Sequence, residues 1–548
     1  MQRPIAVLAL TLGCAARLAA QTDSTRPAPV APAAAAVPAS VPAAAPISAP
    51  QAAPPSTLYL PIASWVSPYV EYLIRAGVLR GLDPLERPLK RADVARAVAR
   101  VDTARLAAPV RATLRLVASE LEERRDTVRW KVEGYVAAEG ASDASRWTDR
   151  PQPEDTHAFY QGGLTGSVEF PHVGIVTSPY FDTRMKDDSE FEGYKTRVIA
   201  GWNAEAYVRA EWKYFSIFFG SEPRNWGPTE ANGLVLSPNP YPYDHLMLRL
   251  GPERFRVEEI ATELNPLPIQ GTGVLTRRYA SMHRLYVQPS DRLALALSEG
   301  VLYAGDSTHA EPSWEPWYLN PANLWLLVDA NGLGEPTKDF LSLEASYLAG
   351  RSVHLSGQLF ANDVKVDKRT ATNPEKPEEL GYTLSATGGA LGGLATWTAL
   401  YTRVDNNVYQ TQKGTQFQYS LWGVGIGRDH IDYDQSTLKV NTLLAPRAIL
   451  GGELTFIRQG QGNFALPFPP LDSLNGSYRF LTGVVERTLR VAVQANWTPV
   501  PGIVLSTDVG RHFIWNANHV AGVRGDRWVW RLQAEIRRRY SGGVHLGG

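Results

Sequence analysis

The stretch that decides the fold is Arg197-Val-Ile-Ala-Gly-Trp-Asn-Ala-Glu-Ala-Tyr-Val-Arg-Ala-Glu-Trp-Lys213, in which polar and apolar side chains alternate. One face carries Glu205 and Arg209, whereas the other face carries Trp202 and Val208. Side chains of a β-strand point alternately to two faces, so a period of two predicts a strand. A charged face opposite an aromatic and aliphatic face is typical of the wall of a membrane β-barrel.

The same alternation recurs from Arg129 to the end of the chain, for example over 131–136, 292–298, 340–347 and 530–537. A soluble β-sandwich would show a similar pattern. Three observations favour the barrel: a secretory leader, Trp and Tyr near the expected strand ends, and strands that continue without a domain-like break. The sequence therefore predicts an all-β transmembrane β-barrel of about 16–18 antiparallel strands over 127–548.

The N-terminal residues predict a leader and a linker. Residues 1–20 contain Arg3, then an apolar run, then Ala19-Ala20, which is typical of a secretory signal peptide. Cys14 is the only cysteine, and it leaves lipidation of the leader open as an alternative. Residues 21–57 are rich in Ala and Pro and cannot bury a core, so we expect a disordered linker.

A helical period replaces the strand period over 58–126. Trp65, Tyr69 and Leu73 lie on one stripe, and Gly77 ends the first helix. Two further helices are expected over about 91–101 and 108–125. The sequence predicts a small α-helical bundle on the periplasmic side, which serves either as a plug or docking module or as a structural cap.

Composition narrows the classes of function. Basic and acidic residues balance at 55 each, so no general nucleic-acid footprint is present. Aromatic residues make up 10% of the chain, which suits interfacial girdles and stacking on sugars. The ten His residues lack zinc-ligand spacing, and no Gly-x-Ser-x-Gly motif occurs. We therefore expect no metal, no cofactor and no catalytic residue.

Two long stretches, near 221–243 and 305–339, interrupt the strand pattern and are predicted to be loops that enter the barrel. Aromatic and cationic side chains in them can stack on sugar rings and pair with acidic groups. The alternative is a hydrophobic plug core or an interfacial belt. The candidate residues for polysaccharide binding or for a loop constriction are Arg224, Trp226, Gly227, Pro228, Trp314 and Trp317.

The first of these loops carries a family resemblance. Arg224-Asn-Trp226-Gly227-Pro228, followed by Gly233-Leu-Val-Leu-Ser237, resembles the Wzi-type capsule assembly proteins of the outer membrane. Tyr69–Gly77 also resembles the helical lead of distant members. The resemblance implies an 18-stranded barrel with a periplasmic helical bundle, and binding of capsular polysaccharide at the cell surface. The Ala/Pro linker and the Trp-rich second loop depart from the family pattern.

These observations predict a non-catalytic outer-membrane barrel that binds surface or capsular polysaccharide and assists its assembly or attachment. The expected partners are that polysaccharide, outer-membrane lipid and polysaccharide export machinery, without nucleic acid. A porin or substrate-specific channel is the alternative function. An enzyme embedded in the barrel is a third hypothesis, for which no catalytic constellation is visible.

Overall fold

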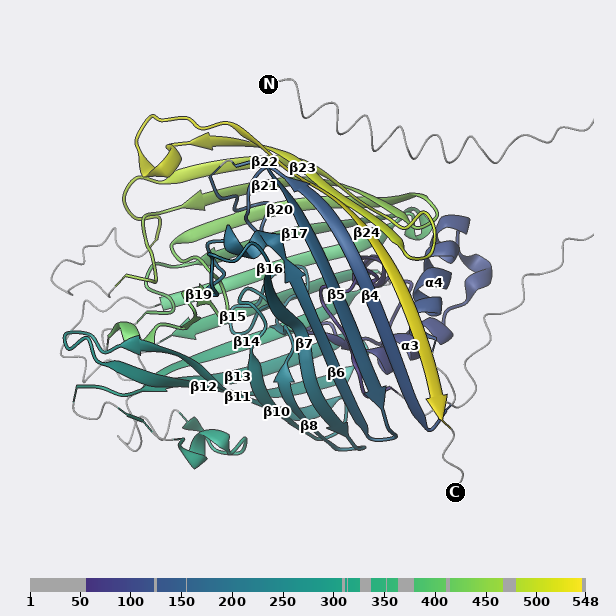
Figure 1. The fold of residues 1–548 in the computed structure, drawn as a ribbon, viewed down its shortest axis with the longest axis horizontal. Coiled ribbons are helices and arrows are strands. Elements are labelled where there is room, and N and C mark those ends of the chain that lie inside the picture. The colour runs from purple at the N-terminus through teal and green to yellow at the C-terminus, as the bar shows by residue number, and fades with distance from the viewer. Residues whose placement is uncertain are drawn as a thin grey trace, which may run out of the picture. The chain divides into compact units, whose positions relative to one another are not determined.

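The structure, a computed structural model, describes residues 56–122, 126–153, 155–307, 311–312, 314–325, 337–350, 352–362, 379–410, 414–466 and 480–544. The predicted signal peptide, Cys14 and nearly all of the predicted linker lie outside these residues. The dominant feature is a closed barrel of eighteen antiparallel strands (Figure 1). This barrel and its few helices confirm the predicted fold class.

Each barrel strand pairs with its neighbours in sequence order, and the last strand closes the ring on the first through the register Arg531↔Ala141 to Val544↔Val128. The strands of the barrel are β4 (Val128–Ala141), β5 (His157–Glu169), β6 (Val173–Asp182), β7 (Ala200–Glu211), β8 (Phe215–Ser221), β10 (Asp244–Leu250), β11 (Phe255–Pro268), β12 (Leu275–Ser290), β13 (Leu293–Ala304), β14 (Thr337–Ala349), β15 (Val353–Asn362), β16 (Glu379–Ala390), β17 (Ala395–Val404), β20 (Tyr433–Ala445), β21 (Ala448–Gln459), β22 (Glu486–Trp497), β23 (Ile503–Trp515) and β24 (Arg527–Val544).

The alternation in the sequence separates the two faces of the wall. On β7, Arg209 is fully buried inside the barrel, whereas Val208 faces outward and is 47% exposed. The same division holds on β12, where Arg284 points inward and Leu285 is exposed on the outside. An apolar exterior around a polar interior is the arrangement that a lipid bilayer requires of a barrel.

The two ends of the barrel differ in the length of their connections. At one end, β5 and β6 are joined by residues 170–172 and β20 and β21 by residues 446–447. At the other end, residues 183–199, 222–243 and 405–432 form long connections. We call these the short-turn end and the long-loop end.

Three α-helices in the described part of the chain pack against the short-turn end: α2 (Ser67–Arg75), α3 (Arg91–Ala99) and α4 (Ala108–Leu121). Tyr69 Oη donates a hydrogen bond of 2.9 Å to the Arg447 carbonyl, and Tyr72 Oη donates one of 3.0 Å to the Gly393 carbonyl. Both acceptors lie in short turns, so the bundle is fastened to this end. None of the helices in the described ranges is both long and apolar enough to cross a membrane.

Segments from both ends fill the lumen. From the helical side, β1 (Tyr59–Leu60) pairs with β3 (Leu89–Lys90), and β2 (Glu86–Arg87) pairs with β9 (Asn225–Trp226) of the loop between β8 and β10. From the long-loop side, residues 405–432 bring in the small hairpin of β18 (Ser420–Leu421) and β19 (Val424–Gly425). These segments share one apolar core with inward side chains of the wall. Short 3-10 helices occur at η1 (Thr103–Arg105), η2 (Thr183–Lys186), η3 (Pro316–Leu319), η4 (Leu391–Gly393), η5 (Thr415–Phe417) and η7 (Ala517–His519).

The loop between β13 and β14 takes a different path from the one predicted. The Trp325 amide donates a hydrogen bond of 3.1 Å to Glu299 Oε2, and the Trp325 ring lies 4.1 Å from the His283 ring. Glu299 and His283 are on the outward face, two residues from the exposed Leu297 and Leu285. The described residues 314–325 therefore cover the outer wall instead of entering the barrel, and the turn η3 lies outside the ring of strands (Figure 1).

Candidate functional site

Four of the six candidate residues lie buried in the lumen: Arg224, Trp226, Gly227 and Pro228. Arg224 Nε donates a hydrogen bond of 2.7 Å to His245 Nε2, and the guanidinium carbon lies 4.4 Å from the centre of the Phe218 ring. The Tyr59 ring, from the N-terminal segment, is on another side at 5.0 Å. Arg224 is thus held by aromatic faces of both the wall and the plug.

Trp226 ties the loop to the N-terminal segment. It is fully buried, its amide donates a hydrogen bond of 3.0 Å to the Leu236 carbonyl, and the Arg284 guanidinium lies 5.2 Å from its ring centre. Gly227 has a φ of +124°, and a β-carbon there would lie 2.5 Å from the Gln358 side chain. This φ strains any residue that has a β-carbon, which favours glycine here, and the motif forms part of a packed plug.

Trp314 and Trp317 lie in the loop on the outer wall and are 42% and 39% exposed. The Trp314 ring packs edge-on against Tyr279 at 5.4 Å. Because Tyr279 faces outward, these two Trp residues are on the opposite side of the wall from Arg224 and Trp226. The six candidate residues therefore form two separate groups and not one site.

Buried ion pairs fasten the plug to the inner wall. Arg284 on β12 is fully buried and pairs with Glu258 on β11 at 3.2 Å and with Glu344 on β14. Its guanidinium also donates a hydrogen bond of 3.1 Å to the Leu85 carbonyl of the plug. Arg256 pairs with Glu86 at 2.9 Å. Because each charge has a partner in a dry interior, losing one member would leave the other uncompensated.

A comparable ion pair joins helix α2 of the bundle to the β2 segment of the plug. Arg87 donates two hydrogen bonds, of 2.6 and 3.1 Å, to the two carboxylate oxygens of Glu71 on α2. Burial alone would raise the pKa of Glu71, but the charge and hydrogen bonds of Arg87, helped by Arg75, outweigh burial and hold that pKa below its usual range. The carboxylate is therefore ionised at neutral pH and supports the position of the β2 segment.

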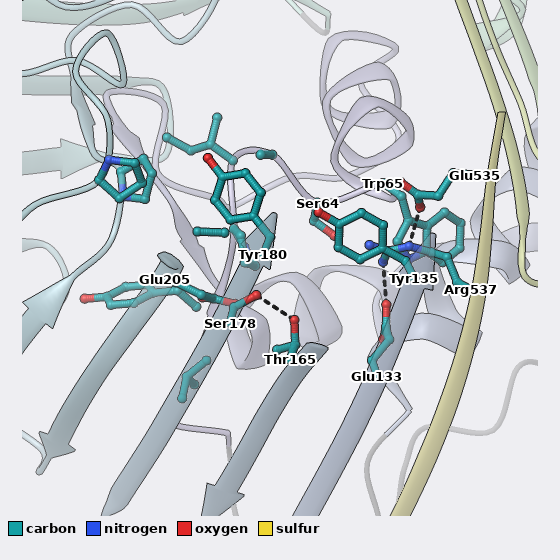
Figure 2. A pocket seen from close by; sticks show the side chains of 18 of the residues that line it. Ser64, Trp65, Glu133, Tyr135, Thr165, Ser178, Tyr180, Glu205, Glu535 and Arg537 are labelled. Carbon is teal, nitrogen blue, oxygen red and sulfur yellow. Dashed lines mark hydrogen bonds and ion pairs between the residues drawn. The ribbon is translucent and has the colours of Figure 1, made fainter. Parts of the chain in front are cut away.

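The lumen is not completely filled, because a cavity of about 1110 Å³ remains beside the plug (Figure 2). Its wall is formed mainly by inward side chains of β24, β4, β5, β6 and β7, together with Asn496 of β22 and Val504 and Ser506 of β23. At the short-turn end it is bordered by residues 61–65, and at the long-loop end by Trp147 and by residues 238–242. Aromatic rings from several elements face it: Trp65, Tyr135, Trp147, Tyr180, Tyr207 and Tyr241.

Charged side chains around the cavity are balanced in number, and every basic one is paired. Of the described residues that line it, eight are basic and eight are acidic. Figure 2 shows Arg537 between Glu133 and Glu535, with the Thr165 and Ser178 hydroxyls hydrogen-bonded at 2.7 Å. The basic lining residues are Arg91, Arg129, Lys131, Arg146, Arg184, Arg531, Arg537 and Arg539, and the acidic ones are Glu120, Glu122, Glu133, Glu139, Glu169, Asp182, Glu205 and Glu535.

The border of the cavity at the long-loop end combines rings with charges. The Arg146 guanidinium lies 4.1 Å from the centre of the Tyr241 ring and 3.3 Å from Asp188 Oδ2. Trp147 Nε1 donates a hydrogen bond of 3.3 Å to Glu190 Oε2. Aromatic faces beside hydrogen-bonding groups are the features that fix polar ligands in binding pockets.

Two carboxyl groups meet at the side of the cavity. Glu205 on β7 lines it, and Glu222, in the loop after β8, adjoins Glu205 and is buried. Burial and the neighbouring Glu205 raise the pKa of Glu222 well above its usual range. This environment therefore favours the protonated form of Glu222. Among the described residues, no group of three or more His, Cys, Asp or Glu is arranged to hold a metal ion.

The sequence did not predict this cavity. Its lining on the wall comes from seven strands, and β24 and β4 are at opposite ends of the barrel sequence. The sequence does show that the polar faces of β4 and β6 carry Tyr135 and Tyr180 among charged and hydroxyl residues, which is a feature of a ligand-binding surface. Nothing in a single strand indicates which part of the inner face the plug leaves uncovered.

Comparisons with known proteins support the class of the fold. No protein family model matches the chain, and no curated protein matches it. Among solved structures, the chain is similar to Wzi of Escherichia coli, an outer-membrane protein involved in group 1 capsule assembly and a carbohydrate-binding β-barrel, with a TM-score of 0.56 and 12% identity over 85% of this chain and 97% of Wzi. At this identity the likeness concerns the fold alone.

A second group of similar structures consists of other outer-membrane proteins. The outer-membrane protein OprD of Pseudomonas aeruginosa aligns with a TM-score of 0.42 and 11% identity, over 76% of this chain and 94% of OprD. At that TM-score the likeness supports no functional argument. The eighteen-stranded ring and the apolar exterior place the chain in the class of outer-membrane β-barrels.

Proposed function

We propose that this protein is a non-catalytic barrel of the outer membrane that binds surface or capsular polysaccharide and assists its assembly or attachment at the cell surface. The observation that carries the proposal is the cavity beside the plug, whose wall combines aromatic rings, hydroxyls and paired charges. Such a wall offers both stacking and hydrogen bonding to sugars. The fold shared with Wzi, a carbohydrate-binding barrel, supports the same function.

The lengths of the connections support a proposal for the orientation in the membrane. Outer-membrane barrels have short periplasmic turns and longer extracellular loops. The helical bundle at the short-turn end would then lie in the periplasm, where polysaccharide export machinery could contact it. The exposed Trp314 and Trp317 lie outside the barrel wall, where they would contact either polysaccharide or the outer-membrane lipid.

The direct test is binding of the host's own surface polysaccharide to the purified full-length protein in detergent, measured by isothermal titration calorimetry. We expect saturable binding without release of new reducing ends, because no hydrolysis is proposed. Deletion of the gene should reduce the amount of polysaccharide that stays attached to cells. Absence of binding together with wild-type attachment would disprove the function.

A substrate-specific channel is the second candidate, because the same cavity could pass small solutes. Conductance measurements in planar bilayers distinguish the two functions. Steady conductance through the wild-type protein, unchanged when polysaccharide is added, would favour the channel. Little conductance, together with polysaccharide binding, would favour the first proposal.

A further inference from the structure

The cavity extends along the wall of the barrel. On β4, its lining residues extend from Arg129 near the short-turn end to Glu139 near the long-loop end. At about 3.3 Å per residue, these ten steps cover roughly 33 Å of strand. We call this cavity of about 1110 Å³, which follows the strand over that length, the groove. Its shape suits an extended chain that runs along the wall.

The middle of the groove presents uncharged hydrogen-bonding groups and rings. Thr165 and Ser178 face each other from β5 and β6, and Tyr135 and Tyr180 stand on either side of them (Figure 2). Amides and hydroxyls extend this surface along the wall, at Gln161, Ser167, Ser506 and Gln533. Such groups both donate and accept hydrogen bonds, as the hydroxyls of a sugar do.

The cations of the groove are already neutralised. Each of its eight basic side chains forms an ion pair with a carboxylate, for example Arg129 with Glu169 at 3.1 Å and Arg531 with Glu139 at 2.9 Å. A polyanionic chain would meet as many carboxylates as cations. It could bind a cation only by displacing that cation's carboxylate partner, which leaves a charge unpaired in a partly dry site.

We infer that this groove binds an extended segment of an uncharged glycan, selected over an acidic glycan by its paired charges, with sugar rings against Tyr135 and Tyr180. The inference rests on the proposed function and adds the location, the conformation and the charge class of the ligand. An uncharged chain loses no ion pairs on entry, because the groove offers it hydroxyls and aromatic faces.

Two probes of equal length test the charge class: a linear neutral glucose heptasaccharide and a linear galacturonic acid heptasaccharide. We expect the wild-type full-length protein to bind the neutral probe at least tenfold more tightly, by calorimetry. Equal or tighter binding of the acidic probe would overturn the inference.

Two matched variants test the location. Thr165→Trp fills the groove, whereas Leu164→Trp adds the same ring on the lipid side, where Leu164 is 55% exposed. We expect Thr165→Trp to weaken binding of the neutral probe at least tenfold and Leu164→Trp to leave it unchanged. Tyr135→Ala removes a ring without filling space and should also weaken binding at least fivefold, which keeps the test valid if Thr165→Trp does not fold. Heat-modifiable migration on gels identifies folded protein.

The outcomes separate this inference from the proposed function. If wild type binds host polysaccharide and the folded groove variants bind it and the neutral probe equally well, the groove is not the site, but the function stands. If wild type does not bind host polysaccharide, the function itself fails. Bilayer conductance that the neutral probe does not block would identify a solute path and overturn the groove inference.

Discussion

Glu86 and Trp226 are partners in a two-stranded antiparallel sheet inside the barrel, although Glu86 follows the first helix and Trp226 belongs to the loop between β8 and β10. The Gly227 amide extends this contact with a hydrogen bond of 2.9 Å to the Leu85 carbonyl. The helical bundle and the inward loop thus share one plug. Changes in this loop should therefore affect the stability of the whole molecule.

Trp226→Ala is expected to destabilise the barrel by about 3–5 kcal/mol, the usual cost of removing a large buried aromatic side chain. The ring is fully buried between the loop and Arg284. Chemical unfolding in detergent, followed by heat-modifiable migration, measures the change. Trp314→Ala is the matched control and should change stability by less than about 0.5 kcal/mol, since this ring is exposed. Equal effects of the two substitutions would contradict the assigned roles.

Arg284→Leu should be as damaging, because it leaves Glu258 and Glu344 without their buried partner. Removing one member of a buried ion pair costs about 3–5 kcal/mol. The control is Arg254→Leu, whose pair with Asp291 is exposed at the short-turn end and should contribute less than about 1 kcal/mol. Unfolding midpoints of both variants provide the measurement, and a stable Arg284→Leu protein would show that the network does not hold the plug.

Joint replacement of Trp314 and Trp317 by Ala tests whether the outer loop contributes to polysaccharide binding. Loss of two stacking rings should weaken binding by about 1–3 kcal/mol in total, at about 0.5–1.5 kcal/mol per aromatic contact. The unfolding midpoint should stay unchanged, because both rings are exposed. Unchanged affinity would assign these residues to an interfacial belt, the alternative that the sequence leaves open. The same measurement on Leu164→Trp controls for altered lipid contacts.

The barrel could be predicted from the sequence because the alternation of polar and apolar residues that indicates it lies within each single strand. The alternation around Trp202 and Val208 repeats on many strands, and each repeat reports which side chains face lipid. The sequence of a long loop has no such period, so it does not show on which side of the wall the loop lies. The sequence predicts that Trp314 and Trp325 belong to an inward loop, but their rings pack on outward residues such as Tyr279 and His283. Aromatic composition indicates that a loop packs, but not on which face of the wall.

The plug and the cavity also depend on contacts between distant parts of the chain. Residues 86–87 are too few to show a strand period, so their pairing with residues 225–226 could not be predicted. Glu205 and Glu222 are brought together by the antiparallel pairing of β7 with β8, in which Ala206 lies opposite Ser221. The resemblance located Arg224 and Trp226 as an important motif. Only the packing shows that they belong to the plug, whereas residues of seven strands line the groove.

The carboxyl pair gives a prediction on pH. Burial and the neighbouring Glu205 raise the pKa of Glu222 in the folded protein well above its value of about 4.3 in an unfolded chain. Between these two pKa values the folded state holds a proton that the unfolded state has lost. The free energy of unfolding should therefore fall as pH rises through this window. Below the window both states are protonated, so pH has no effect on stability through this group.

Glu222→Gln removes this proton linkage and leaves an amide that can still donate a hydrogen bond to Glu205. We expect the variant to be more stable than wild type at pH 7.5, and this difference to vanish near pH 3, where Glu222 is protonated in both states. Unfolding midpoints across this pH range measure the effect. Glu192→Gln, on an exposed loop, is the control and should follow wild type at every pH. A variant less stable than wild type at pH 7.5 would mean that Glu222 is ionised in the folded barrel and that its charge is compensated by a cation such as Arg224.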